Sequence, residues 1–154
     1  DAAAVGKVKP VLASLGSTFF EVGTLGSGHA AKALNNVVAA ANYAALAESL
    51  MVADSYGIDA KTLVDIISTS TGQSFISNVV MTQFVIPATY NSGFKIGLLS
   101  KDVTIAAELS TDLGCESPLI QLAQQRWEAA RDALGPDADH SRAILAWSRD
   151  KKIN

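Results

Sequence analysis

Hydrophobic residues recur along most of this chain at the spacing of amphipathic helices. Between His29 and Tyr56 apolar positions fall three or four residues apart, with small alanines around them, which predicts one long helix that ends at Gly57. The same periodicity predicts four further helices, at residues 60–70, 75–82, 96–113 and 118–134. A short helix is expected at residues 139–148, with Asp139 as its N-cap. The body of the chain is therefore predicted to be all-α.

The first 25 residues have a different pattern. Residues 1–15 show helical spacing and are followed by Gly16, whereas residues 18–22 are β-branched and aromatic, which is typical of a strand. A glycine-rich turn follows at residues 23–28. Because one strand cannot make a sheet, we interpret residues 1–25 as the last α–β unit of a larger domain. Residues 26–154 form the predicted helical domain.

Composition narrows the class of protein. The chain has 154 residues, 49% hydrophobic and 18% charged, as expected for a folded domain with a core. A net charge of −3 gives no support for nucleic-acid binding, and no uninterrupted apolar run approaches the roughly 20 residues that span a bilayer. Cys115 is the single cysteine, which excludes an internal disulfide and favours a reducing, cytoplasmic location. The two histidines show no metal-ligand spacing, so no metal is expected.

The segment from Gly26 to Ala31 matches the dinucleotide-binding pattern G-x-G-x-x-[G/A] and opens a helix. That pattern also requires a second strand, ending in an acidic residue about 20 residues later. Glu48 stands near this distance, but it lies inside the long predicted helix, and no second strand follows. We therefore reject a Rossmann phosphate loop here.

A longer pattern is more specific. Gly26-x-Gly28-x-x-x-Lys32-x-x-Asn35-Asn36 resembles the interdomain motif of β-hydroxyacid dehydrogenases, the family of 3-hydroxyisobutyrate dehydrogenase and tartronate semialdehyde reductase. Further matches follow in the family's order: Phe94, Lys101-Asp102, Gly114, Pro118-Leu119, Gly135 and Asp139-His140-Ser141. The resemblance covers essentially the whole chain. It implies a helical C-terminal domain like that of 6-phosphogluconate dehydrogenase, preceded by the remnant α–β unit of an NAD(P)-binding domain whose remainder is absent.

The resemblance implies roles for two residues on the long helix. Lys32 would be the general acid/base while hydride passes between a small β-hydroxyacid and a nicotinamide. Asn36 would bind the substrate, and its position four residues later puts both side chains on one helix face. Without the motif, Lys32 would be interpreted as a surface charge and Asn36 as a polar residue packed between helices.

The resemblance also implies cofactor contacts. Gly26 and Gly28 would let the backbone approach NAD or NADP, and Phe94, Lys101 and Asp102 would lie at the nicotinamide end, with Asp102 orienting its neighbours. Alternatively, Phe94 is a core residue and Lys101-Asp102 an exposed charge pair. The family's phosphate-binding and substrate-carboxylate loops are not found in these 154 residues. The isolated chain is therefore expected to be inactive, with the cofactor bound mainly by the absent domain.

The predicted function is that of a domain of an NAD(P)-dependent oxidoreductase. Its substrate would be a small β-hydroxyacid such as 3-hydroxyisobutyrate, and the protein would form a homo-oligomer through the helical domain. The alternative is a non-catalytic helical dimerisation module that kept the motifs by descent. The sequence names neither the particular acid nor NAD over NADP.

Overall fold

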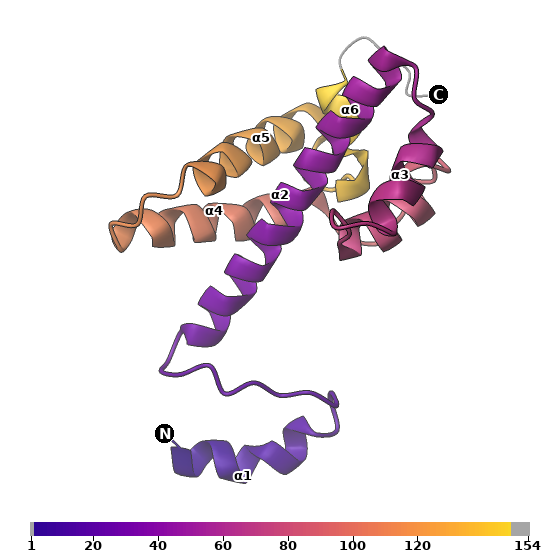
Figure 1. The fold of residues 1–154 in the computed structure, drawn as a ribbon. Helices are drawn as coiled ribbons and strands as arrows, with labels where there is room; N and C mark the ends of the chain where they lie inside the picture. The colour runs from indigo at the N-terminus through magenta and orange to yellow at the C-terminus, as the bar shows by residue number, and fades with distance from the viewer. Residues whose placement is uncertain (1, 149–154) are drawn as a thin grey trace.

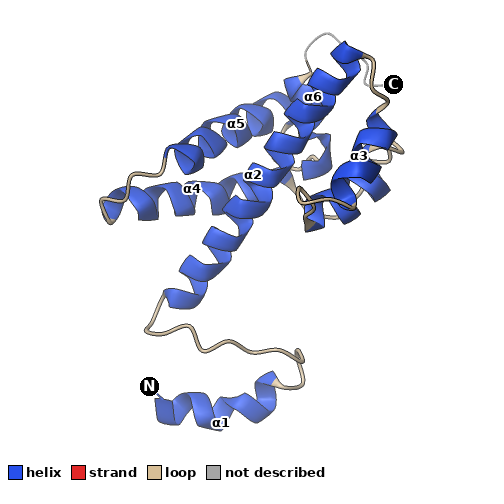
Figure 2. Ribbon diagram, viewed as in Figure 1, coloured by secondary structure: helices blue, strands red, loops and turns tan. Residues whose placement is uncertain are grey.

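The computed structural model describes residues 2–148, and the mainly α-helical fold is confirmed (Figures 1 and 2). The last six residues of the predicted helical domain lie outside this range. The elements in chain order are α1 (Ala2–Leu12), α2 (Ser27–Tyr56), α3 (Ala60–Ser68), the π-helix η1 (Ile76–Val85), α4 (Ile96–Asp112), α5 (Pro118–Leu134), the 3₁₀-helix η2 (His140–Arg142) and α6 (Ala143–Trp147).

The long helix α2 is the centre of the domain, and α4 and α5 pack along it on one side while α3 and η1 pack on the other (Figure 1). Its buried positions recur three or four residues apart, in agreement with the sequence pattern. It ends at Gly57, whose φ of 92° is the left-handed conformation that glycine adopts readily. Thirty residues of apolar helix also satisfy the length and composition of a membrane span. Packing against α3, η1, α4 and α5 buries part of this helix, and the absence of membrane contact stays a prediction.

An aromatic cluster joins α2 to the C-terminal part of the chain. Trp127 on α5 is fully buried, and its indole Nε1 donates to the backbone oxygen of Ala40 on α2 at 3.2 Å. The Tyr43 hydroxyl donates to the backbone oxygen of Ser141 at 2.6 Å, and the Tyr43 and Trp127 rings meet edge to face. Both polar atoms are satisfied, so the buried rings hold α2, α5 and η2 together without an unpaired donor.

The predicted strand at residues 18–22 is wrong for this structure. These residues are irregular, and within residues 2–148 the only β pairing is an isolated bridge between Lys95 and Asp139. A strand exists only when a neighbouring backbone pairs with it, and no described segment lies against this one in that way. Helix α1 lies apart from the bundle, and its apolar residues Val5, Val8 and Leu12 remain exposed (Figure 1).

Four helix predictions need smaller corrections. The helix predicted at 75–82 is a π-helix that continues to Val85, and the backbone N–H of Ile86 bonds the oxygen of Met81, five residues earlier. The helices predicted at 60–70 and 96–113 end earlier, at Ser68 and Asp112. The helix predicted at 139–148 is divided into η2 and α6. Its predicted N-cap is confirmed, because the Asp139 side chain accepts the backbone N–H of Ser141.

The start of α4 is fixed against the segment that follows α5. The backbone N–H groups of Ile96 and Gly97 donate to the oxygens of Ala138 and Pro136 at 2.8 and 3.0 Å. A Cβ atom at Gly97 would lie 2.8 Å from the oxygen and 3.0 Å from the Cβ of Pro136. Only a residue without a side chain therefore permits this approach, which sets where α4 enters the bundle.

We expect Gly97→Ala to lower the free energy of unfolding by about 1–3 kcal/mol, because the added methyl group must displace backbone. Urea denaturation followed by tryptophan fluorescence measures this change. Gly6→Ala in α1 is the matched control, because a Cβ there meets nothing within 4 Å. Equal midpoints for Gly97→Ala and the unaltered chain would contradict the packing described here.

Candidate functional site

A buried carboxylate on α4 receives two side chains from α2. Asp102 is 4% exposed, and its Oδ2 atom accepts hydrogen bonds from the Lys32 ammonium and, at 2.6 Å, from the Asn36 amide. Lys32 and Asn36 are one turn apart on α2, so both reach the same oxygen from one helix face. Two donors to a single oxygen lie within about 6 Å of each other. The structure thus brings three of the predicted site residues into one cluster.

The electrostatics of this cluster keep Asp102 ionised. Burial raises the pKa of Asp102, but the hydrogen bonds from Lys32 and Asn36 and the charge of Lys32 outweigh it and lower the pKa from its ordinary value. Lys101 adds a weaker contact, with its Nζ atom 3.9 Å from Asp102 Oδ1. The side chains of Lys32 and Lys101 are 60% and 63% exposed, so the carboxylate lies beneath two accessible ammonium groups.

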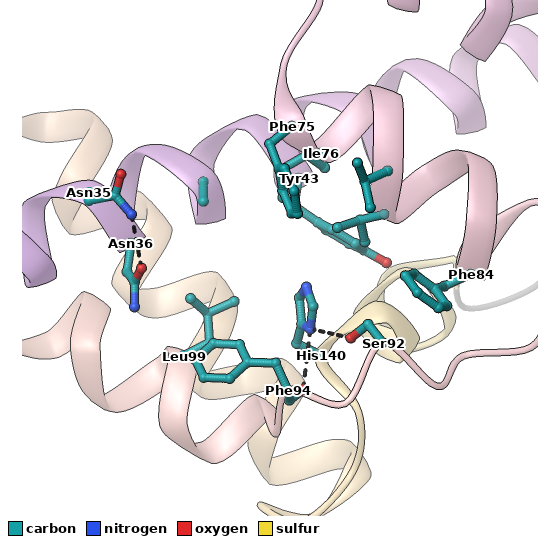
Figure 3. A pocket seen from close by; sticks show the side chains of 13 residues that line it. Asn35, Asn36, Tyr43, Phe75, Ile76, Phe84, Ser92, Phe94, Leu99 and His140 are labelled. Carbon is teal, nitrogen blue, oxygen red and sulfur yellow. Dashed lines mark hydrogen bonds between the residues drawn. The ribbon is translucent and has the colours of Figure 1, made fainter. Parts of the chain in front are cut away.

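A pocket of about 470 Å³ opens beside Asn36, between α2, η1 and the start of α4 (Figure 3). This volume is within the range of small-molecule sites. The residues that line it are Asn35, Asn36, Ala39, Tyr43, Phe75, Ile76, Val79, Val80, Phe84, Ser92, Phe94, Leu99 and His140. None of them is a lysine, arginine, aspartate or glutamate. The wall is mostly apolar, with polar side chains at Asn35, Asn36, Ser92 and His140.

His140 is the buried polar residue of this wall, at 6% exposure. Its Nδ1 atom lies 3.2 Å from the backbone oxygen of Phe94 and 3.0 Å from Ser92 Oγ (Figure 3). Burial lowers the pKa of His140 below its ordinary value, so the ring is neutral at pH 7. Asp139 holds the same loop, because it accepts from Ser92 Oγ and from the backbone N–H of Gly93, each at 2.8 Å.

The remaining predicted residues occupy separate places. Phe94 lines the pocket, with its ring 5.7 Å from that of His140, and so shares a cavity with Asn36. Gly26 is the N-cap of α2 with a φ of 92°, and Gly28 lies in the first turn. At Gly26 a side chain would meet nothing within 4 Å, so its backbone is open to an approaching group.

Apart from Asn36 and Phe94, the residues of the pocket wall were not identified from the sequence. Tyr43, Phe75 and Phe84 carry no pattern beyond that of apolar helix positions, and Ser92 carries none at all. His140 was part of a recognised segment, but nothing in the sequence indicates that it packs against the loop before Phe94. Within the described range, no group of three or more metal-ligating side chains comes together.

Comparison with known proteins agrees with this fold. The family described as "NAD-binding of NADP-dependent 3-hydroxyisobutyrate dehydrogenase" matches residues 26–147, which is most of the chain. The molecule is therefore a helical domain of the hydroxyacid dehydrogenase class. It belongs to the 3-hydroxyisobutyrate dehydrogenase family, as the ordered motifs predicted.

Individual relatives are similar over nearly the whole chain. Identity is 32% with 2-(hydroxymethyl)glutarate dehydrogenase of Eubacterium barkeri, over 93% of this chain and 48% of the relative. It is 30% with 2-hydroxy-3-oxopropionate reductase of Escherichia coli, over 95% and 50%. The solved 3-hydroxyisobutyrate dehydrogenase of Mycobacterium tuberculosis superposes with a TM-score of 0.86 at 26% identity, over 96% of this chain and 52% of that one. The chain spans about half the length of the relatives it matches.

We expect Asp102→Asn to lower the free energy of unfolding by about 1–3 kcal/mol at pH 7. The pKa of Asp102 is lowered by folding, so its contribution is complete above the unfolded value of about 3.9 and is lost as pH falls through the folded value. The difference in free energy of unfolding between Asp102→Asn and the unaltered protein should therefore become smaller below about pH 4. Urea denaturation at pH 7, 5, 4 and 3 measures it.

The matched control is Asp112→Asn, at the exposed end of the same helix, which should change the free energy of unfolding by less than about 0.5 kcal/mol. A difference between Asp102→Asn and the unaltered protein that is constant from pH 7 to pH 3 would rule out the ionised Asp102 as the source of the effect.

Proposed function

We propose that this chain is the helical domain of an NAD(P)-dependent oxidoreductase that acts on a small β-hydroxyacid. The observation that carries the proposal is that one buried carboxylate, Asp102, holds an accessible lysine, Lys32, and an asparagine that lines the neighbouring pocket, Asn36. Family membership supports it, as do the activities by which two relatives are named, 2-(hydroxymethyl)glutarate dehydrogenase and 2-hydroxy-3-oxopropionate reductase. The natural substrate would be of the same class as 3-hydroxyisobutyrate.

In the proposed reaction, Lys32 transfers the proton to and from the substrate hydroxyl. During oxidation its neutral amine takes the proton of the substrate hydroxyl while the carbinol carbon loses hydride and becomes a carbonyl; during reduction the ammonium returns the proton. The nicotinamide, when bound, accepts or supplies the hydride. Asn36 uses one amide N–H on Asp102 and has a second for the substrate. Asp102 is too buried for open contact with a ligand, which favours a positioning role over the predicted contact with cofactor.

We also propose a division of the chain for cofactor binding. Residues 1–25 would be the end of an N-terminal NAD(P)-binding domain, and residues 26–154 the helical domain. Gly26 and Gly28 would pass close to the cofactor, and at Gly26 no side chain covers the backbone. Phe94 and Lys101 would face the nicotinamide end. NAD or NADP would be held mainly by residues outside this chain, in a cytoplasmic enzyme.

We expect Lys32→Ala, made in the natural gene product that contains this chain, to lower kcat for 3-hydroxyisobutyrate by about 10²–10⁴-fold. Lys61→Ala is the control, because Lys61 lies on the exposed surface of α3 and forms an ion pair with Asp65 of the same helix. Formation of NAD(P)H at 340 nm measures both variants. Full activity of Lys32→Ala would favour the alternative, a non-catalytic dimerisation module.

The same assay applied to residues 1–154 alone should give no turnover. Robust NAD(P)H formation by this chain would contradict the proposed division of the cofactor site.

Exposed apolar side chains support the proposed homo-oligomer. Val38 and Val52 on α2 are 60% and 70% exposed, and Leu119 on α5 is 75% exposed. Surfaces of this kind are stabilised by burial against another protein. We therefore expect light scattering at micromolar concentrations to give a mass of at least two chains, and a clean monomer would contradict it.

A further inference from the structure

We propose that the pocket beside Asn36 binds the substituent at C2 of the β-hydroxyacid, and that it selects an uncharged substituent larger than methyl that ends in a hydrogen-bond donor. This inference rests on the proposed function and names the substrate class for that site. It is carried by the position of the pocket, its size, its lack of charged side chains, and a hydrogen-bond acceptor of His140 in its wall.

The position follows from Asn36, which belongs to both sites. Its amide donates to Asp102 beside Lys32, and the residue also lines the pocket (Figure 3). If the hydroxyl of the substrate bonds Lys32 and its carbinol carbon lies beside Asn36, the carbon next to the carbinol carbon lies at the mouth of the pocket. In a β-hydroxyacid that carbon is C2, so the group that enters the pocket is the C2 substituent.

Size and charge restrict that substituent. A methyl group fills about the volume of one water molecule, about 30 Å³, whereas the pocket holds about 470 Å³. Its lining residues include no lysine or arginine, and the ammonium group of Lys32 is directed to Asp102. A carboxylate in the pocket would be desolvated without a counter-ion, which is costly. A second carboxylate, such as that of 2-(hydroxymethyl)glutarate, is therefore disfavoured.

The tautomer of His140 is the reason for the proposed preference for a substituent that ends in a hydrogen-bond donor. The Phe94 backbone oxygen can only accept, so the proton of the neutral ring is on Nδ1. Ser92 donates its own proton to Asp139, which agrees with this assignment. Nε2 is then an unprotonated acceptor. It points away from Ser92 in Figure 3 and has no hydrogen-bond partner among residues 2–148. A hydroxyl or N–H at the end of a ligand chain would satisfy it.

The test uses four 3-hydroxypropanoates that carry methyl, butyl, 3-hydroxypropyl or 2-carboxyethyl at C2, with the natural gene product that contains this chain. We expect kcat/KM for the butyl acid to exceed that for the methyl acid by about tenfold or more. The 3-hydroxypropyl acid should exceed the butyl acid again, and should exceed the carboxyethyl acid by about 100-fold. Equal or better turnover of the methyl acid, or a preference for carboxyethyl, would overturn the inference while leaving the proposed function intact.

Two variants locate the effect in the pocket. His140→Phe should remove the preference for 3-hydroxypropyl over butyl, because it deletes the acceptor. Val79→Phe places a larger side chain of η1 in the pocket. It should lower the ratio of kcat/KM for the butyl acid to kcat/KM for the methyl acid about tenfold. Ile66→Phe, on the exposed face of α3, is the control and should leave the ratios unchanged. Unchanged ratios in Val79→Phe would overturn the inference even if His140→Phe fails to fold.

If none of the four acids is turned over, the proposed function fails, and calorimetric binding of the same acids decides the inference separately. Binding in the expected order that is weakened by Val79→Phe would support the pocket, and binding of none of them would overturn it.

Discussion

The site depends on one buried negative charge. Asp102 is almost fully covered by protein, and a carboxylate in that position must be paired and hydrogen-bonded to remain ionised. Lys32 and Asn36 meet this requirement, and both come from the same face of α2. The rotation of α2 against α4 is therefore restricted, because a turn of either helix would leave the carboxylate unpaired. The same bond holds the lysine that we propose as the acid/base group.

The pocket depends on where α4 enters the bundle. The backbone hydrogen bonds from Ile96 and Gly97 to the segment after α5 place Phe94 beside His140. On the other side, the π-helical turns of η1 change which side chains face the cavity. π-Helical turns are frequent at functional sites, and this one borders the pocket directly.

Helix α2 contributes to the core, to the candidate site and to the pocket. Its central residues form the core with Trp127, its first turns carry Lys32 and Asn36, and its middle supplies Tyr43 to the pocket. Core packing therefore fixes the rigid element on which the reactive groups stand, which suits a site that must hold a substrate in one geometry. The open backbone at Gly26 lies at the N-terminal end of this helix, next to the residues that we propose belong to another domain.

Local pattern determined much of this molecule. The helices from α2 to α5 follow from apolar periodicity, Asp139 from capping chemistry, and the shared face of Lys32 and Asn36 from their four-residue spacing. Local sequence alone could not decide whether residues 18–22 form a strand, because a strand depends on a pairing partner elsewhere in the chain. Only tertiary structure decided that Asp102, which is 66 residues beyond Asn36, closes the cluster. It also decided that His140 faces a pocket built from several distant segments. Such contacts depend on how whole helices pack, and the spacing of residues along the chain does not encode that packing.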